Sequence, residues 1–368
     1  MRVLYDHQIF TEQVYGGISR YFSQLLIELS KLPEVSVELP DICTYNEHLP
    51  AQYRTTPGPL LESRIKFIKR YARKRVERLN KLATQKALQT GKYDIFHPTY
   101  YDHDYLSHKH SKRVVTIHDM IHEIYGEMID KGGKLSALKR RECELADHII
   151  CVSHSTKRDL IEQFKIEPEK ITVVHLGGGE SVEMQVDAST LQLPEKYFLY
   201  VGKRGYYKKF ETLYDAALPL LKNKKELHLI CTGPAFSMDE QKQFEADGVA
   251  QQVMNLYVSD ADLQTLYKGA SAFVFPSEYE GFGIPTLEAM SVGCPTILQQ
   301  TSSLPEVGGD AALYFEDNSV EQLRAHLESI IHDSDLRLSL RQKGIVQAGQ
   351  FSWERCARET LTVYQNLL

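Results

Sequence analysis

The chain has 368 residues, of which 42% are apolar and 25% are charged, and its formal net charge is −6. This length allows two domains with separate cores, and the composition is that of an ordinary globular protein. The overall charge does not suggest nucleic acid as a partner. A membrane span is not expected either, because the sequence has no run of about 20 apolar residues. The N-terminus lacks a signal-peptide pattern. The six cysteines are scattered without a Cys-x-x-Cys pair, so we expect reduced thiols in a cytoplasmic protein, and neither disulfides nor a zinc site.

The N-terminal segment predicts a strand, a glycine pair and a helix. Residues 3–6 read as a strand, and Gly16-Gly17 precede a helix over 19–29 with apolar residues three and four positions apart. A strand, a glycine pair and a helix in this order let a phosphate approach the backbone. A Gly-Gly pair is also typical of a plain turn. The sequence contains neither a Gly-x-Gly-x-x-Gly motif at this place nor a P-loop.

Residues 64–92 are the most basic stretch of the chain and contain a single acid, Glu77. Their spacing predicts an amphipathic helix with a cationic face. Its apolar residues fall at three- and four-residue intervals: Ile65, Ile68, Ala72, Val76, Leu79 and Ala83. Two interpretations stay open, a core-packed helix with a solvated outer face, or a surface for anionic lipid headgroups or a diphosphate-linked acceptor. A nucleic-acid arm is disfavoured because no aromatic stacking pattern accompanies the charges.

Two further predicted strands, 94–98 and 113–119, carry histidines where they end. Ligands of an open parallel sheet bind outside the carboxyl ends of its strands, so His97 and His118 are placed at such ends. For His97 we favour a hydrogen-bonded structural role. The remaining histidines nearby lack a regular metal-ligand spacing.

A helix over 135–146, a strand over 147–153, a helix over 155–164 and a short strand over 171–176 complete the first half. The polar stretch 180–194 has no clear periodicity, and we expect it to link two domains.

The second half opens with a strand over 197–202 that is followed by four cations: Lys203, Arg204, Lys208 and Lys209. Arginine binds phosphate bidentately and lysine acts as a point charge, so this loop predicts a phosphate pocket. A solvated basic loop is the alternative. Strands are also expected over 227–233 and 253–259, with a helix over 261–269 that Asp260 would cap.

A buried strand over 272–276 runs into the turn Glu280-Gly281-Phe282-Gly283 and a helix over 286–292. The two glycines let the backbone approach a ligand, and the free N–H groups at the helix start favour an anion. Glu280 and Glu288 have seven residues between them. Because a helix rises about 1.5 Å per residue, their carboxylates would sit at different depths of one cleft.

The segment PSEYEGFGIPTLEAMSVGCP at 276–295 resembles the signature of the family-four retaining glycosyltransferases, which have the GT-B fold. ADHIICVSHSTKRDL (146–160) and SSLPEVGGDAALYF (302–315) resemble the same family. The resemblance implies an α/β fold of two doubly wound, Rossmann-like domains that face a central cleft. It implies an acceptor-side domain over 1–185, a nucleotide-sugar-binding domain over 186–350 and a helix over 351–368 that crosses back to the first domain.

The resemblance also implies roles for individual residues. His118 would lie beside the donor sugar, with Asp119 holding it, and Glu280 would bind the sugar hydroxyls. Arg204 and Lys208 would grip the pyrophosphate, with Lys203 as an alternative to the arginine. The donor-binding residues would be the loop at Gly17, the turn of Gly281, Phe282 and Gly283, and Glu288 on the ribose hydroxyls.

The implied reaction moves a hexose from a nucleoside diphosphate sugar to a hydroxyl of a glycan or a polyprenyl-diphosphate-linked acceptor, with retention and without a metal or other cofactor. The implied setting is polysaccharide or lipopolysaccharide synthesis at the inner face of the cell membrane, with the 64–92 helix as a possible membrane contact. The sequence does not give the donor sugar, the base or the acceptor. A nucleotide-sugar epimerase and a catalytically idle membrane-associated scaffold stay open as alternatives.

Overall fold

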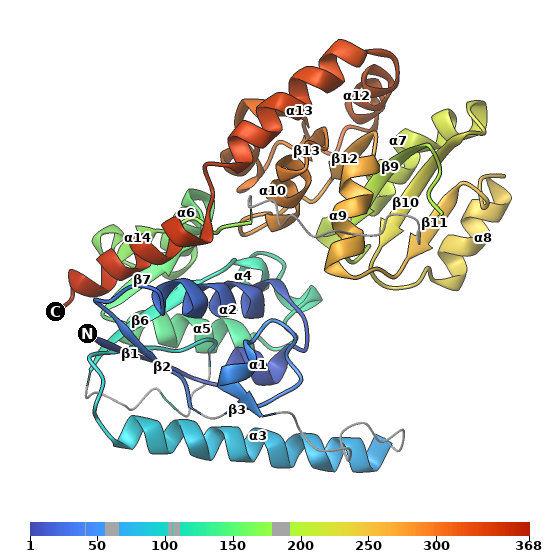
Figure 1. The fold of residues 1–368 in the computed structure, drawn as a ribbon. Coiled ribbons are helices and arrows are strands. Elements are labelled where there is room, and N and C mark those ends of the chain that lie inside the picture. The colour runs from blue at the N-terminus through green and yellow to red at the C-terminus, as the bar shows by residue number, and fades with distance from the viewer. Residues whose placement is uncertain (41, 56–65, 102–104, 106–110, 179–191) are drawn as a thin grey trace. The chain divides into compact units, whose positions relative to one another are not determined.

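The computed structural model describes residues 1–40, 42–55, 66–101, 105, 111–178 and 192–368; the side chains of 66–73, 127 and 260 are outside this description. The chain forms two compact units, drawn in Figure 1. Unit 1 comprises Met1–Leu176 and Trp353–Leu368, and unit 2 comprises Gly177–Ser352. Most of the predicted linker, 180–191, lies outside the described residues, as does the predicted boundary at 185/186.

Unit 1 contains a six-stranded parallel sheet in the order β2-β1-β5-β6-β7-β8. Apart from the edge strand β2, its strands are short and mostly apolar, as expected for a sheet that is covered on both faces. They are β1 (Arg2–Tyr5), β2 (Ser36–Glu38), β5 (Ile95–His97), β6 (Lys112–Ile117), β7 (His148–Cys151) and β8 (Ile171–Val173). The strand order reverses direction between β1 and β5, and such a switch point is where ligands bind in open α/β sheets.

Seven α-helices are described in unit 1: α1 (Gln8–Glu12), α2 (Gly17–Leu29), α3 (Lys66–Gln89), α4 (Ile121–Ile124), α5 (Lys134–Leu145), α6 (His154–Phe164) and α14 (Trp353–Gln365). A small second sheet pairs β3 (Ile42–Cys43) with β4 (Arg54–Thr55). Short 3-10 turns are η1 (Ala51–Tyr53), η4 (Gly126–Met128) and η5 (Pro168–Lys170).

The C-terminal helix α14 packs on α2 (Figure 1) and is tied into the sheet by buried hydrogen bonds. The hydroxyl of Tyr364 lies 2.7 Å from the hydroxyl of Tyr5 on β1 and 2.5 Å from Nδ1 of His97 on β5. Nε2 of His97 lies 2.9 Å from Oγ1 of Thr116 on β6. Both nitrogens of His97 are therefore occupied, which agrees with its predicted structural role.

Unit 2 contains a second six-stranded parallel sheet, in the order β11-β10-β9-β12-β13-β14. Counted within the unit this order is 3-2-1-4-5-6, the Rossmann arrangement, with the switch point between β9 and β12. The strands are β9 (Lys196–Val201), β10 (Leu227–Thr232), β11 (Val253–Leu256), β12 (Ala272–Phe275), β13 (Thr296–Gln299) and β14 (Ala312–Phe315).

Helices cover both faces of this sheet because successive strand residues point to opposite sides. Phe198 and Tyr200 pack in one apolar cluster with α7 and α12, whereas Tyr197 and Leu199 pack in another with α9 and α10. The helices are α7 (Phe210–Asn223), α8 (Met238–Ala246), α9 (Asp260–Gly269), α10 (Ile284–Ser291), α11 (Leu304–Gly308), α12 (Val320–His332) and α13 (Ser334–Ala348), with 3-10 turns η7 (Tyr206–Lys208) and η8 (Gly309–Ala311).

Two local predictions in unit 2 need correction. The strand expected over 253–259 ends at Leu256, and Tyr257 is almost fully exposed. The N-cap of α9 is Ser259, not Asp260, because the Ser259 hydroxyl accepts a hydrogen bond from the Asp262 N–H and completes a capping box.

The basic helix α3 is present, but its buried face differs from the predicted one. Arg64 and Ile65 lie outside the described residues, and the description of α3 side chains begins at Lys74. From there on the buried residues are Asn80, Thr84 and Leu88, one helical turn apart. Asn80 bonds both the N–H and the carbonyl of Cys43. Leu79, which was expected on the apolar face, is 51% exposed because polar docking of Asn80 and Thr84 turns it outwards.

No helix within the described parts of the chain has both the length and the apolar character that crossing a membrane requires.

Candidate functional site

The switch point of unit 2 brings two predicted site residues together. The loop after β9 carries Lys208, and the turn after β12 carries Glu280. Lys208 Nζ donates to Glu280 Oε1 at 2.6 Å, and both side chains are mostly buried. The ammonium group also lies over the rings of Tyr207 and Phe275, at 5.1 and 5.5 Å from their centroids. A cation and a carboxylate are thus held at the edge of the sheet where a ligand is expected.

The loop that carries Lys208 has an unusual backbone. Gly205 has a φ of 106°, and the non-glycine residues Tyr206 and Lys209 have φ values of 48° and 46°. Such left-handed residues cost about 1–3 kcal/mol each and persist where surrounding contacts hold them. One such contact is the hydrogen bond from the Glu278 N–H to the Tyr207 carbonyl, at 2.7 Å. The two loops at the switch point therefore fix each other.

Arg204 has partners other than this pair. Its Nε donates to Glu240 Oε1 at 2.7 Å, and its Nη2 donates to the carbonyls of Pro234 and Ala235. The guanidinium also lies 4.5 Å from the centroid of the Phe236 ring. Desolvation raises the pKa of Glu240, but hydrogen bonds from Arg204 and Ser237 outweigh it and hold that pKa below its ordinary value.

Lys203, the predicted alternative to Arg204, is exposed. The Lys203 carbonyl accepts a hydrogen bond from the Tyr200 hydroxyl at 2.6 Å. Its side chain is thus closer to solvent than that of Arg204, while its backbone is fixed to β9.

The turn Gly281-Phe282-Gly283 is buried and leads into α10. Gly283 has a φ of 96°, and a Cβ there would meet Leu304 Cδ2 at 3.0 Å, so the backbone and the available space both favour glycine. The Phe282 ring packs edge to face with Phe351, with 5.8 Å between centroids. The start of α10 offers fewer free N–H donors than the sequence suggested, because Pro285 has none and the Thr286 N–H donates to the Gly283 carbonyl.

Two serines that the sequence analysis missed hold the backbone of Glu280. The Glu280 N–H donates to Ser302 Oγ at 3.0 Å, and Ser303 Oγ donates to the Glu280 carbonyl at 2.9 Å. Ser302 has a left-handed φ of 49°. The only signal in the sequence was their position soon after β13, at the carboxyl edge where site residues gather.

Glu288 lies on α10, half-buried, and accepts a hydrogen bond from the Tyr267 hydroxyl at 3.3 Å. This places the second glutamate of the motif in unit 2, just over one helical turn into α10, whereas Glu280 precedes the helix.

In unit 1, His118 follows β6 and packs against α2. Its ring centroid lies 5.0 Å from that of Tyr21 and 5.9 Å from that of Phe22. Burial lowers the pKa of His118 to about 4; nearby Asp119 raises this pKa and Lys139 lowers it. Its Nε2 is buried and has no hydrogen-bond partner within the described chain. His118 is therefore a neutral imidazole with bonding capacity to spare.

Asp119 was expected to hold His118 but makes other contacts. Its carboxylate accepts from the Ile121 N–H at 3.2 Å and lies 3.8 Å from Lys139 Nζ. The carboxylate caps the turn that follows, and its influence on His118 is through charge.

The two glycines before α2 differ in their surroundings. A Cβ at Gly16 would clash with Gln13 Oε1, whereas a Cβ at Gly17 would meet nothing within 4 Å. The Gln13 side chain is held there by the Ser19 N–H, which donates to it at 3.1 Å. A side chain at Gly16 would therefore have to displace Gln13 from the Ser19 N–H, whereas the space beside the predicted residue, Gly17, is open.

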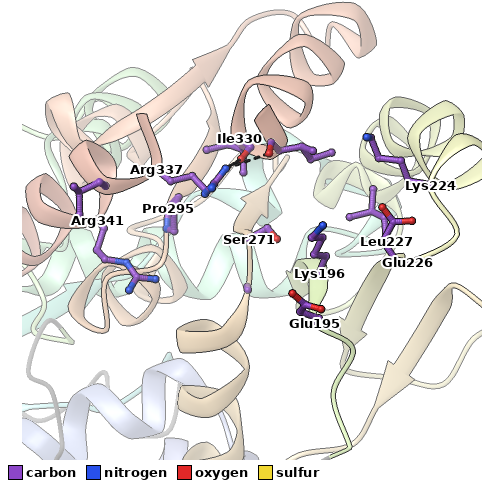
Figure 2. Close-up of a pocket in the computed structure, with 13 residues that line it drawn as sticks. Glu195, Lys196, Lys224, Glu226, Leu227, Ser271, Pro295, Ile330, Arg337 and Arg341 are labelled. Carbon is purple, nitrogen blue, oxygen red and sulfur yellow. Dashed lines mark hydrogen bonds between the residues drawn. The ribbon is translucent and has the colours of Figure 1, made fainter. Parts of the chain in front are cut away.

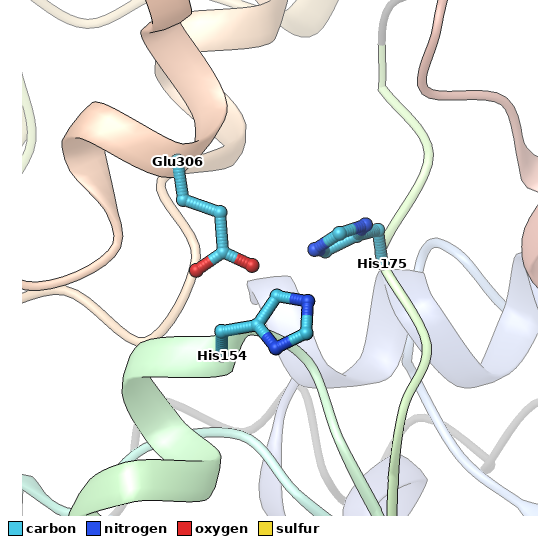
Figure 3. A group of neighbouring side chains, drawn as sticks. All are labelled: His154, His175 and Glu306. Atoms are coloured by element: carbon cyan, nitrogen blue, oxygen red, sulfur yellow. The ribbon is translucent and has the colours of Figure 1, made fainter.

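Two other features lie apart from these residues. Figure 2 shows a cavity of about 450 Å³ in unit 2, lined by Lys196, Leu227, Ser271 and Pro295 among others. These residues start or precede strands, so the cavity lies at the amino edge of the sheet, opposite the switch-point loops. Figure 3 draws His154 and His175 of unit 1, whose rings pack edge to face with 5.8 Å between their centroids.

Comparison with known families covers both halves of the chain. Residues 15–177 match the model described as Glycosyltransferase Family 4, and residues 182–347 match the model described as Glycosyl transferases group 1. The chain is 31% identical over 296 residues to O-antigen chain mannosyltransferase B of Escherichia coli, and the match covers 76% of each protein.

A second relative is the serotype-specific mannosyltransferase WbdA of Escherichia coli, which is 27% identical over 244 residues. That match covers 62% of this chain but only 30% of WbdA. Among solved structures, sucrose-phosphate synthase from Thermosynechococcus elongatus superposes with a TM-score of 0.75 at 19% identity, covering 100% of this chain and 98% of that one, which shows a common fold. The chain belongs to the family 4 glycosyltransferases and has their GT-B fold.

Proposed function

We propose that the chain transfers a hexose from a nucleoside diphosphate sugar to a hydroxyl of a glycan or lipid-linked acceptor, with retention at the anomeric carbon. The observation that carries this proposal is the Lys208–Glu280 pair at the switch point of unit 2. A cation beside a carboxylate suits a donor that combines a diphosphate with sugar hydroxyls. The curated relatives act in O-antigen and serotype-specific mannose transfer, which supports polysaccharide or lipopolysaccharide synthesis and makes mannose the first sugar to test.

The proposed chemistry depends on stabilising the diphosphate as it leaves. Lys208 would neutralise developing charge, and the open backbone at Gly17 would let the phosphates approach. Arg204 would join them through its Nη1, which has no partner within the described chain, or by leaving Glu240, and Lys203 is the exposed alternative. Because these groups supply positive charge, we propose that no bound metal ion is needed, and chelation with EDTA should leave the rate unchanged.

The remaining residues would position the sugar and nucleotide. Glu280, whose backbone two serines fix, would bind the sugar hydroxyls, with the turn of Gly281, Phe282 and Gly283 beside it. Glu288 would bind the two ribose hydroxyls, a task suited to two acceptor oxygens. His118 would contribute an uncharged hydrogen bond from unit 1.

Retention in ordinary glycosidases uses a carboxylate nucleophile. Glu280 is a poor candidate for that role because its carboxylate is already bonded to Lys208 at 2.6 Å. We therefore propose that the acceptor attacks from the face of the departing phosphate, which takes its proton. A glycosyl adduct on Glu280, found by mass spectrometry during turnover, would contradict this mechanism.

The function is tested by incubating the protein with GDP-mannose and with UDP and dTDP sugars, in the presence of a synthetic polyprenyl-diphosphate glycan. We expect one donor to give a product whose anomeric configuration, read by NMR, equals that of the donor. Turnover of a donor without acceptor would indicate an epimerase instead. Absence of both binding and turnover with every donor would favour an idle scaffold.

We also propose that α3 contacts an anionic membrane at the inner face of the cell. Leu79 and Leu82 are 51% and 52% exposed, and Leu82 lies on the side of the helix away from the buried residues Asn80 and Thr84. Exposed cations surround the two leucines: Lys74, Arg75, Arg78 and Lys86. Figure 1 shows α3 as one long helix along the outside of unit 1. Apolar residues among cations on an exposed helix face are typical of interfacial helices.

Sedimentation with vesicles of phosphatidylglycerol and phosphatidylcholine tests this contact. Leu79→Ser/Leu82→Ser and Arg75→Glu/Arg78→Glu should each lower the bound fraction, the charge variant most strongly at low salt. Leu338→Ser is the matched control, because Leu338 in unit 2 is 55% exposed on a helix. Equal binding of the vesicles by wild type and all variants would contradict the proposed membrane contact.

A further inference from the structure

A lysine on α5 is buried inside unit 1. Lys139 is 1% exposed, although lysine is almost never fully buried without partners. Its Nζ donates to Glu123 Oε2 at 2.7 Å and to the Asp119 carbonyl at 2.9 Å. Glu123 is itself nearly inaccessible, with 3% of its side chain exposed. A buried ion pair of this kind contributes little to net stability, so a role in fixing local structure explains its presence better.

Both partners of Lys139 belong to one short segment. Asp119 directly follows His118, and Glu123 lies four residues further on, in α4. The ammonium group thus bonds both the first and the last residue of the turn that follows His118, namely Asp119 and Glu123. The hydrogen bond to the Asp119 carbonyl matters more for the position of His118, because it fixes the backbone one residue beyond the imidazole.

The opposite side of His118 is fixed by packing alone. Tyr21 and Phe22 of α2 contact the ring edge to face. Its Nε2 has no partner within the described chain, so no hydrogen bond from that nitrogen orients the ring. The direction of the imidazole therefore depends on the aromatic contacts on one side and on the turn held by Lys139 on the other.

Lys139 also acts on the charge of this histidine. The groups that face His118 are Asp119 from its own turn, Lys139 from α5, His97 from β5 and Tyr21 from α2. Burial is the largest influence and lowers the pKa of His118; Asp119 opposes it, and Lys139 adds to it. Without the ammonium group, Asp119 would favour the charged imidazolium.

We propose that Lys139 is a positioning residue for sugar transfer, which fixes the turn after β6 so that His118 presents a neutral, correctly directed imidazole to the donor. Lys139 itself touches neither substrate nor reacting atoms in this role. The inference rests on the role given to His118 under the proposed function, and the experiment separates the two.

The test compares Lys139→Met with the double variant Lys139→Met/Glu123→Gln. The single variant leaves a buried carboxylate without its cation and can fail to fold; the double variant removes both charges. Lys112→Met is the matched control, because Lys112 pairs with Asp147 at 3.3 Å in the same unit but is exposed. Circular dichroism and thermal melting establish that each variant is folded.

In the folded double variant we expect kcat to fall about ten- to a hundredfold while KM for the donor changes little, since a small misplacement of a site group has effects of this size. NMR of histidine-labelled protein, assigned with His118→Gln, should show the pKa of His118 moving up from about 4. A folded variant with unchanged kcat and an unchanged His118 titration would overturn the inference.

The variant His118→Gln shows which of the two claims fails, the role of His118 in the proposed function or the positioning role of Lys139. If it retains full activity, the role of His118 under the proposed function is wrong and the inference falls with it. If it is inactive while the double variant matches wild type, only the inference about Lys139 is wrong.

Discussion

The two units share an architecture but differ in the chemistry at the carboxyl edges of their sheets. Unit 2 places charged side chains there, with Lys208 bonded to Glu280 and Arg204 bonded to Glu240. Unit 1 places a buried histidine, His97, and a half-buried one, His118, there. Desolvation lowers the pKa of His97 to about 3 and that of His118 to about 4. One edge therefore suits an anion and the other suits uncharged hydroxyls.

Under the proposed function, this difference would suit one sheet to a diphosphate and the other to a sugar. A diphosphate requires cations, and cations at a loop remain charged because solvent or a carboxylate compensates them. A sugar carries no charge, and a buried neutral imidazole can hydrogen-bond to it without the cost of desolvating an ion.

The largest effect is expected from removing the cation of unit 2. Lys208→Met should lower kcat/KM about 10²–10³-fold, the usual range for losing one group that stabilises developing charge. The loss should appear in steady-state kinetics with the best donor. Lys222→Met, which breaks an exposed ion pair with Asp247 in the same unit, should stay within about twofold of wild type.

Acid should destabilise unit 1 before unit 2. The folded pKa values of His97 and His118 lie below the ordinary 6.5, so the unfolded chain binds more protons in this range. The stability they contribute is complete above pH 6.5 and is lost as pH falls towards 4, by a few kcal/mol.

Trp353 makes this acid effect measurable, because the only tryptophan of the chain is buried in unit 1, 6.4 Å from the Tyr21 ring. Its fluorescence transition in urea should move to lower urea between pH 7 and pH 5, ahead of the circular dichroism signal of the whole chain. His118→Gln should reduce the shift. Coincident transitions at both pH values would contradict the contrast between the units.

A smaller effect is expected at the turn before α10. Gly283→Ala forces a side chain into a left-handed conformation and towards Leu304, so we expect a loss of about 1–2 kcal/mol in the free energy of unfolding. Chemical denaturation measures it. Gly205→Ala is a useful comparison, since its φ of 106° carries the same strain but its Cβ would meet open space.

The smallest effect concerns Arg204. If this arginine leaves Glu240 to bind the diphosphate, Glu240→Gln should tighten binding of a nucleoside diphosphate by up to about fivefold, since a partly exposed ion pair is worth at most about 1 kcal/mol. Weaker binding would contradict this, and would show that Glu240 holds Arg204 in the position from which it binds.

Much of this arrangement could be predicted from the sequence. Apolar runs that end in glycine or polar residues located the strands, and the spacing of Glu280 and Glu288 located the turn and helix that carry them. These signals are local, so one sequence suffices to find them. The family resemblance, now supported by matches to both halves of the chain, added the GT-B fold.

What could not be predicted depends on contacts between residues far apart in the chain. Lys139 stands beside two other cations in Lys139-Arg140-Arg141 and reads as part of a solvated face, yet it is buried. Arg204 reads as a free cation, but its partner Glu240 comes from a helix 36 residues later. Leu79 fits an apolar stripe, but the docking of α3 through Asn80 and Thr84 decides which face is buried.

The contrast between the units is tested most directly by calorimetric titration of nucleoside diphosphates, GDP and UDP among them, into wild type, Lys208→Met, Glu288→Gln and His118→Gln. We predict that one nucleotide binds wild type, that both unit 2 variants bind it at least about tenfold more weakly, and that His118→Gln binds it as wild type does. Unchanged binding in both unit 2 variants, or loss of binding in His118→Gln alone, would contradict the assignment of the charged end of the donor to unit 2.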